Sequence, residues 1–175
     1  MNGDDRFKIL VTEDAIQERV RELGVEITRD YRGRDLVLVG VLKGSCLFMA
    51  DLCRHVDLPL TMEFLGLSSY GDRTESSGVV QITQDLTHPV EDMDVLLVED
   101  IVDTGLTLDF LMDHFRVRKP RSVGICTLLH KPSNTVKDVQ LDYVGFTIEN
   151  RFVVGYGLDY EQRFRNLPYI GYVED

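Results

Sequence analysis

The chain has 175 residues, 43% of them hydrophobic, which is enough for a single domain over residues 1–175 with a sizeable core. Nineteen basic residues against thirty acidic ones give a net charge of −11, which argues against nonspecific binding to nucleic acid or to an anionic membrane. No apolar run approaches the roughly eighteen residues that span a bilayer, and the first residues lack the basic and apolar regions of a secretory signal. We therefore expect a cytoplasmic protein.

The three cysteines predict neither a disulfide nor a zinc site. Cys46 and Cys53 fall on one predicted helix, where their separation corresponds to about 10 Å of rise, too far for a disulfide to bridge. Cys126 is distant in sequence, and there is no Cys-x-x-Cys pair of the kind that binds zinc. We therefore expect reduced, mostly buried thiols in a cytoplasmic protein.

Hydrophobic periodicity divides the chain into alternating strands and helices. An apolar stretch over residues 7–11 leads to Thr12, a favourable N-cap, and apolar residues at helical spacing then run from Ile16 to Ile27. A second helix is predicted over residues 47–56. A third has an apolar face made of Leu108, Leu111, Met112 and Phe115. Strands are predicted over residues 36–42, 60–67, 79–83, 95–98, 122–129 and 143–148.

This alternation predicts an α/β fold, in which a parallel sheet of about five strands is flanked by helices and joined by right-handed crossovers. The segment from Ser68 to Gly78 is rich in glycine, serine and charge, so we expect a mobile loop there. The last forty or so residues break the alternation. We expect them to cap the sheet as a small hood subdomain built from the terminal segments.

The most informative segment is residues 95–108, with the sequence VLLVEDIVDTGLTL. Four apolar residues suited to a buried strand run into the carboxylates Glu99, Asp100 and Asp103. Carboxylates at the end of a parallel strand face the crevice where open α/β sheets bind ligands. The Thr-Gly-x-Thr turn that follows, residues 104–107, is suited to hold an anion with the N–H groups of a helix start. The combination suggests a site for a sugar phosphate.

The sequence of this segment is compatible with two other interpretations. It can be an acidic strand-to-helix turn with an ordinary N-cap. Asp103-Thr104-Gly105 also matches the Asp-Thr-Gly of aspartic proteases, but those enzymes need two such aspartates sharing a proton in a mostly β architecture. This chain has one, and a helical pattern follows it.

The segment resembles the phosphoribosyl-pyrophosphate (PRPP) motif of the type I phosphoribosyltransferases, and residues 9–173 resemble the bacterial hypoxanthine-guanine phosphoribosyltransferases. The resemblance implies that Glu99 and Asp100 bind the ribose hydroxyls, directly or through a metal ion, which suits acceptor-only carboxylates. It assigns proton transfer to Asp103, a role that is compatible with capping a helix. It implies a 5′-phosphate loop made of Thr104, Gly105, Leu106 and Thr107. Some relatives have a lysine where this chain has Leu106. Here the 5′-phosphate would therefore be bound by hydroxyls and backbone N–H groups alone.

Two further loops match the family. Leu42-Lys43-Gly44-Ser45 resembles the pyrophosphate loop, where a cis peptide before the lysine is common, although a plain strand-ending turn is the alternative. Ser69-Tyr70-Gly71 resembles the start of the mobile loop that closes over the site during turnover and excludes water.

The resemblance also implies a purine and pyrophosphate site towards the C-terminus, and the run FVVGYGLDY over residues 152–160 is highly specific to the family. Lys131 would contact the purine, Phe152 would stack on it, and Val153 would meet its edge through the backbone. Asp159 would bind metal together with Glu99 and Asp100, and Arg165 would contact pyrophosphate. Taken singly, Phe152 is typical of a core residue and Arg165 of a surface charge.

The implied function is transfer of phosphoribose from PRPP to the 6-oxopurines hypoxanthine or guanine, with Mg²⁺ as cofactor, in a homodimer or homotetramer. One alternative is a transferase for another purine, such as xanthine. A second, from a different class, is a PRPP-sensing regulator that binds RNA. Such a regulator should have a basic face. With a net charge of −11, this chain has few basic residues available to form one.

Overall fold

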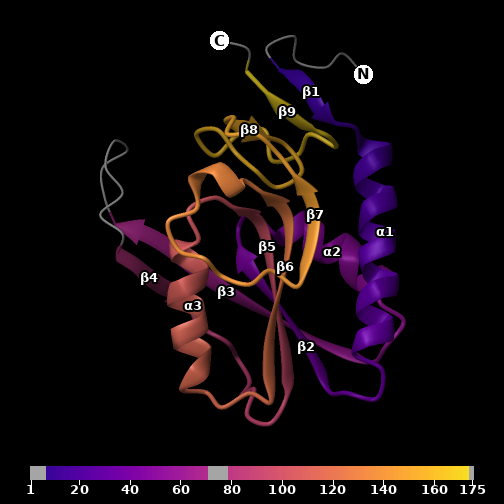
Figure 1. The fold of residues 1–175 in the computed structure, drawn as a ribbon, viewed down its shortest axis with the longest axis vertical. Coiled ribbons are helices and arrows are strands. Elements are labelled where there is room, and N and C mark those ends of the chain that lie inside the picture. Colours follow the sequence, from indigo (N-terminus) through magenta and orange to yellow (C-terminus); the bar gives the residue numbers. More distant parts are fainter. Residues whose placement is uncertain (1–6, 71–78, 174–175) are drawn as a thin grey trace.

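The computed structural model describes residues 7–70 and 79–173, which form two sheets and three α-helices (Figure 1). The larger sheet has the strand order β4-β3-β2-β5-β6-β7. Its strands are β2 (Leu36–Leu42), β3 (Leu60–Tyr70), β4 (Val79–Gln84), β5 (Asp94–Val102), β6 (Ser122–His130) and β7 (Tyr143–Thr147). Five of them are parallel, and β4 alone runs antiparallel, beside β3. The predicted parallel sheet of about five strands is confirmed, with one antiparallel strand added at its edge.

The central strands carry continuous apolar runs because both faces of the sheet are covered. β2 has the sequence LVLVGVL, and its first six residues are buried. β5 is buried from Asp94 to Glu99, and it pairs with β2 on one side and β6 on the other. A strand of this kind shows no alternation of polar and apolar residues, so a short apolar run was the correct signal for it.

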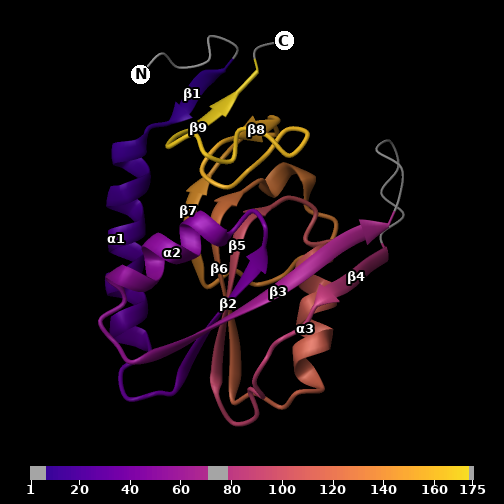
Figure 2. The same ribbon diagram turned by 180° about the vertical axis from the view of Figure 1, so that it is seen from behind.

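Helices cover the two faces (Figures 1 and 2). α1 (Glu13–Asp30) and α2 (Cys46–His55) pack against each other on one face, around a core that includes Phe48 and Met49. α3 (Leu106–Arg116) covers the other face with Leu108, Leu111 and Phe115. α1 begins as predicted, since Thr12 Oγ1 accepts a hydrogen bond from the N–H of Ala15 at 3.3 Å. In the part of the chain that the structure describes, no helix is long and apolar enough to cross a membrane.

The hood is a three-stranded antiparallel sheet that joins the two ends of the described chain. β1 (Lys8–Val11) pairs with β9 (Ile170–Tyr172), which in turn pairs with β8 (Val153–Val154). In Figure 1 this sheet lies at one end of the molecule, beyond the carboxyl ends of the parallel strands. The predicted cap at the C-terminal end is therefore confirmed, with β1 as its third strand.

Three predicted details differ from the structure. Residues 68–70, expected to begin a loop, continue β3 and pair with β4, because antiparallel pairing supplies partners for their backbone groups. The rest of the expected loop, residues 71–78, lies outside the described residues. The strand predicted over residues 95–98 is longer than expected, since β5 continues through Glu99 and Asp100, the expected strand end, to Val102. The thiols were expected to be mostly buried, but only Cys126 is buried: Cys46 is exposed at the start of α2 and Cys53 is half-buried, and all three are free.

Candidate active site

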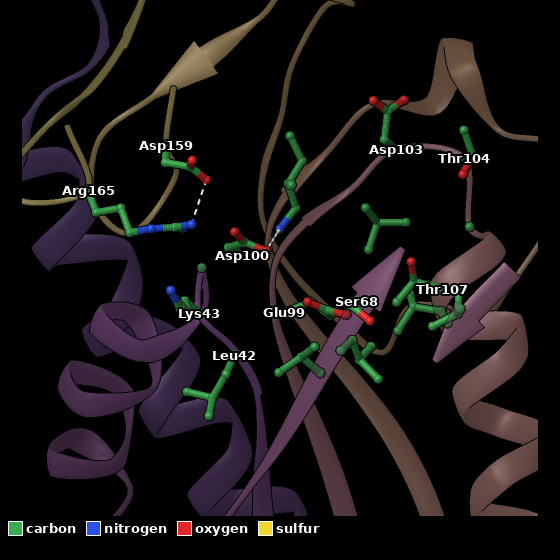
Figure 3. A pocket seen from close by; sticks show the side chains of 18 of the residues that line it. Leu42, Lys43, Ser68, Glu99, Asp100, Asp103, Thr104, Thr107, Asp159 and Arg165 are labelled. Carbon is green, nitrogen blue, oxygen red and sulfur yellow. Dashed lines mark hydrogen bonds and ion pairs between the residues drawn. The ribbon is translucent and has the colours of Figure 1, made fainter. Parts of the chain in front are cut away.

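A cavity of about 450 Å³ opens where the order of the parallel strands reverses (Figure 3). The chain passes from β2 outward to β3, and later continues from β5 on the other side of β2 towards β7. Ligands bind at such a switch point, in the crevice outside the carboxyl ends of the strands. The cavity is lined by these residues from the predicted site: Lys43, Gly44, Glu99, Asp100, Asp103, Thr104, Gly105, Thr107, Asp159 and Arg165.

Glu99 and Asp100 enter the cavity on opposite sides, because successive side chains of a strand alternate. Asp100 lies towards Arg165 and Asp159, and Glu99 lies towards Ser68 and Thr107 (Figure 3). Burial, followed by the charge of Asp100, holds the pKa of Glu99 well above its ordinary value. Burial also raises the pKa of Asp100 to about 6, although the N–H of Ile101 donates to its Oδ1 at 2.9 Å. Strongly perturbed carboxyl groups in a cleft are characteristic of functional sites.

The loop after β2 is in close contact with both β5 and the hood. The peptide bond between Leu42 and Lys43 is cis, as the family resemblance suggested. A Cβ atom on Gly44 would overlap Asp100 Oδ2, so only glycine lets the carboxylate approach this backbone. From the hood, Gly157 has φ +102° and packs against the carbonyl of Gly44. Glycines therefore allow three separate segments to meet at the cavity.

The hood contributes a cluster of charged and polar side chains above that loop. Arg165 pairs with Asp159, with 2.6 Å between Nη2 and Oδ1, and also donates to the carbonyl of Gly157. Gln162 donates its N–H to Asp159 Oδ2 at 2.8 Å. Its Oε1 lies 3.4 Å from Lys43 Nζ and 3.5 Å from Arg165 Nη2. Two cations thus face the same part of the cavity, and a polyanion would find them there.

The turn after β5 has the geometry of an anion site. Gly105 is the N-cap of α3 with φ +80°, a left-handed conformation that suits glycine, and a Cβ atom there would overlap the carbonyl of Lys137. Thr104 Oγ1 accepts from the N–H of Leu106 at 3.4 Å. Thr107 lines the cavity, whereas Leu106 does not. The first N–H groups of α3 have no partners within the helix, and Gly105 and Thr107 at this helix start line the cavity.

Asp103 has two partners from the segment after β6. Asn134 Nδ2 donates to its Oδ1 at 2.7 Å, and Lys131 Nζ lies 3.7 Å from its Oδ2. The side chain of Asp103 remains 43% exposed, while Lys131 is only 7% exposed. A buried ammonium is costly unless a negative group lies beside it, and Asp103 supplies that group. Because Asp103-Thr104-Gly105 joins a parallel strand to a helix, the aspartic protease alternative does not fit this fold.

The remaining predicted site residues are not on the cavity wall. Phe152 is 57% exposed and packs edge-to-face on Tyr160, with 5.7 Å between ring centroids. Val153 is buried in β8. Ser69 and Tyr70 belong to β3, and their backbones pair with β4. Because more than half of the Phe152 side chain is exposed, its ring is accessible to a planar ligand.

The acidic side chains fit a magnesium ion that is shared with a substrate. Among the described residues, no group of three or more carboxylates, histidines or cysteines gathers as a complete metal site. Mg²⁺ is usually held by one or two carboxylates together with water and substrate phosphates. Asp100 and Asp159 lie on the same side of the cavity and suit that mode, whereas Glu99 lies across the strand from them (Figure 3).

Some lining residues were not found from the sequence. Ser68, Ile101 and Gln162 line the cavity, and Asn134 contacts Asp103 from outside it. Ile101 lies between predicted site residues on β5, so its position could have been inferred from the motif. Gln162 and Asn134 reach the site through loop conformations that carry no distinctive spacing.

Comparison with known proteins identifies the class. Residues 8–161 match the model of the phosphoribosyl transferase domain, and the chain belongs to this family. It is 52% identical over 171 residues to a hypoxanthine-guanine phosphoribosyltransferase of Bacillus subtilis, with 98% of this chain and 95% of that protein covered. A hypoxanthine phosphoribosyltransferase of Staphylococcus aureus has a similar structure, with a TM-score of 0.95, 46% identity, and 99% and 96% of the two chains covered. The family and fold predicted from the sequence are confirmed.

The chain also resembles part of a longer protein. It is 53% identical over 168 residues to the bifunctional protein TilS/HprT of Listeria monocytogenes, and the match spans 26% of the length of that relative. The similarity covers 96% of this chain.

Proposed function

We propose that the protein transfers the phosphoribosyl group of PRPP to hypoxanthine or guanine, forming IMP or GMP and pyrophosphate in purine salvage. The observation that carries the proposal is the convergence on one cavity of an acidic strand end, a phosphate turn and two cations, beside a carboxylate that is paired with a buried lysine. Relatives of B. subtilis and Streptococcus pneumoniae that match nearly the whole chain are named for this activity.

PRPP is bound by groups of opposite character. The turn over residues 104–107 holds the 5′-phosphate with N–H and hydroxyl donors. Glu99 and Asp100 accept hydrogen bonds from the ribose hydroxyls. Lys43 and Arg165 contact the pyrophosphate. Ser69 and Tyr70, at the end of β3, begin the segment that closes over it during turnover. Asp100 and Asp159, together with Glu99 on the other side of the strand, would hold Mg²⁺, which would supply positive charge to balance the departing pyrophosphate.

Transfer forms a bond between purine N9 and the anomeric carbon C1′ while the bond from C1′ to the pyrophosphate oxygen breaks. The electron pair of the broken bond leaves with pyrophosphate. The purine loses a proton, and Asp103 accepts or orients that proton at N7. The negative charge of Asp103 also stabilises the positive charge that develops on the sugar.

Lys131 selects the purine. Hypoxanthine and guanine carry an oxo group at position 6, which accepts hydrogen bonds, whereas adenine carries an amino group there, which donates. An ammonium has three donors and no acceptor, so it pairs with the oxo purines and opposes adenine. Phe152 stacks on the base, and the backbone of Val153 meets its edge. A mismatch of buried polar groups discriminates by around 10⁴-fold or more.

We further propose that residues 1–175 act as one phosphoribosyltransferase domain in a cytoplasmic homodimer or homotetramer. For a related hypoxanthine phosphoribosyltransferase of Trypanosoma cruzi, the C-terminal region has been examined for its role in oligomeric state and enzymatic activity. Light scattering after size-exclusion chromatography gives the subunit number, and a monomer at micromolar concentration would contradict this part of the proposal.

The test of function is turnover of hypoxanthine, guanine, xanthine and adenine with PRPP and Mg²⁺, followed by absorbance. Rapid conversion of the first two supports the proposal. Preferential use of xanthine would favour the alternative purine transferase. RNA retardation in a gel at physiological salt, without purine turnover, would favour the PRPP-sensing regulator.

A further inference from the structure

Asn134 reaches the active site because the chain turns sharply after β6. Lys131 precedes the short 3₁₀ helix η1 (Pro132–Asn134), and Pro132 occupies its first position, where a missing N–H costs nothing. The N–H of Asn134 donates back to the carbonyl of Lys131 at 3.3 Å. The turn therefore places the side chains of Lys131 and Asn134 on the same carboxylate, that of Asp103.

The amide of Asn134 uses both of its donors. Nδ2 lies 2.7 Å from Asp103 Oδ1 and 2.8 Å from Asn150 Oδ1. An ionised carboxylate only accepts hydrogen bonds, so the amide nitrogen must face Asp103. Within the described parts of the chain, no other side chain is hydrogen-bonded to Asp103, because Lys131 at 3.7 Å forms an ion pair beyond hydrogen-bond length.

The two partners of Asp103 have different duties during the proposed reaction. Lys131 must turn its ammonium towards the 6-oxo group of the purine, which weakens its hold on Asp103. Asn134 does not have to turn towards the purine, so its amide can keep Oδ1 of Asp103 in place throughout the reaction. One bond uses one of the roughly four lone-pair positions of a carboxylate, so Oδ2 stays available for the proton of the purine.

The second bond of Asn134 connects Asp103 to the segment that stacks the base. Asn150 lies between β7 and β8, two residues before Phe152. One amide therefore links the carboxylate that receives the proton to the segment that places the purine ring. Small errors in such placement are costly, because transfer requires reacting atoms within about 3–3.5 Å in good alignment.

We propose that Asn134 is a positioning residue for phosphoribosyl transfer: it orients the Asp103 carboxylate towards the purine proton and ties it, through Asn150, to the segment that carries Phe152. The inference rests on the proposed function. It adds a determinant of kcat that contacts neither PRPP nor the purine.

The test is a double-mutant cycle with Asp103, measured by steady-state turnover of hypoxanthine. Asn134→Ala should lower kcat by roughly 10- to 100-fold, the usual value of a hydrogen bond to a charged group, and change the KM for PRPP by less than about threefold. In the Asp103→Asn background the same substitution should lower kcat by less than about threefold, because the group through which Asn134 acts is gone. Equal losses in both backgrounds would overturn the proposal.

Three further variants separate positioning from folding. Asn134→Asp keeps the shape but loses both donors and opposes Asp103 with a like charge, so it should lower kcat at least as much as Asn134→Ala. Asn150→Ala leaves the bond to Asp103 intact and should have a smaller effect. Ser133→Ala, at the exposed neighbouring position of η1, is the matched control and should retain wild-type kcat. An Asn134→Asp variant with wild-type kcat, or a loss confined to the KM for PRPP, would contradict the inference.

Failure of the proposed function and failure of the positioning role of Asn134 give different results. A wild-type protein without oxopurine turnover would remove the proposed function, and the role of Asn134 with it. An active wild type whose kcat is indifferent to Asn134 would remove only the positioning role. Thermal unfolding of each variant shows whether a loss of turnover reflects a loss of fold.

Discussion

Replacing Asp100 with asparagine should stabilise the empty protein. Burial raises the pKa of Asp100 from 3.8 to about 6, so at pH 8 the folded protein holds an ionised carboxylate that its surroundings disfavour. This pKa difference corresponds to about 3 kcal/mol in the free energy of unfolding, and solvent access to part of the side chain reduces it to roughly 1–3 kcal/mol. Because asparagine removes the charge with little change of shape, the unfolding temperature should rise by roughly 2–10 °C at pH 8.

The advantage of asparagine should depend on pH. The folded-state pKa of Asp100 lies above the unfolded value, so the neutral carboxyl group contributes stability that is fully present below about pH 3.8 and is lost as the pH rises through about 6. The difference in the free energy of unfolding between Asp100→Asn and wild type should therefore be largest above pH 7 and should fall by about half at pH 5. Asp138→Asn, at an exposed position, is the control and should stay within about 0.5 kcal/mol of wild type throughout.

Ligand binding should respond in the opposite direction. PRPP with Mg²⁺ should raise the unfolding temperature of the wild type by mass action, and Asp100→Asn should lose most of that rise because a ligand carboxylate is missing. Circular dichroism at 222 nm, with and without ligand, measures both effects. A variant less stable than wild type at pH 8, or a gap that does not narrow on acidification, would refute the reasoning about burial of Asp100.

Three other changes test the proposed chemistry. Asp103→Asn should lower kcat by roughly 10²-fold or more with a much smaller change in PRPP affinity; a change confined to KM would reassign Asp103 to binding. Lys131→Gln should lower kcat/KM for hypoxanthine and guanine, and it should reduce the preference for these purines over adenine, since glutamine adds an acceptor. If kcat/KM for the oxopurines and its ratio to that for adenine were both unchanged, Lys131 would have a structural role only. Excess chelator should abolish turnover and added Mg²⁺ restore it, whereas full activity in chelator would exclude the metal requirement.

Much of the fold was predictable because its central elements are specified by local pattern. The buried strand over residues 36–42 matches β2 in its bounds, and the helix over 47–56 differs from α2 by one residue at each end. Thr12 caps α1, as its residue type indicated. The parallel direction of β2, β3, β5, β6 and β7 agrees with the alternation of strands and helices, whereas their order in the sheet was not predicted.

The rest depends on contacts between residues far apart in the sequence. The extension of β3 to Tyr70 is stabilised by pairing with β4, a partner that local composition does not reveal. Glu99 and Asp100 were expected to end the strand, yet β5 continues past them because β6 continues beside it. Asn134 looks like an ordinary turn residue, and only its distance to Asp103 shows otherwise. Motif spacing located most of the site, whereas hydrogen bonds between loops required coordinates.

The pairing of β1 with β9 closes the described chain into a near-ring. Lys8 lies opposite Tyr172 in this ladder, so both ends of the domain leave from the same small sheet. A domain with adjacent ends tolerates tethering at either end, insertion into another protein, or circular permutation with a short linker. Adjacent ends are compatible with the finding that a closely similar sequence makes up about a quarter of the longer Listeria protein.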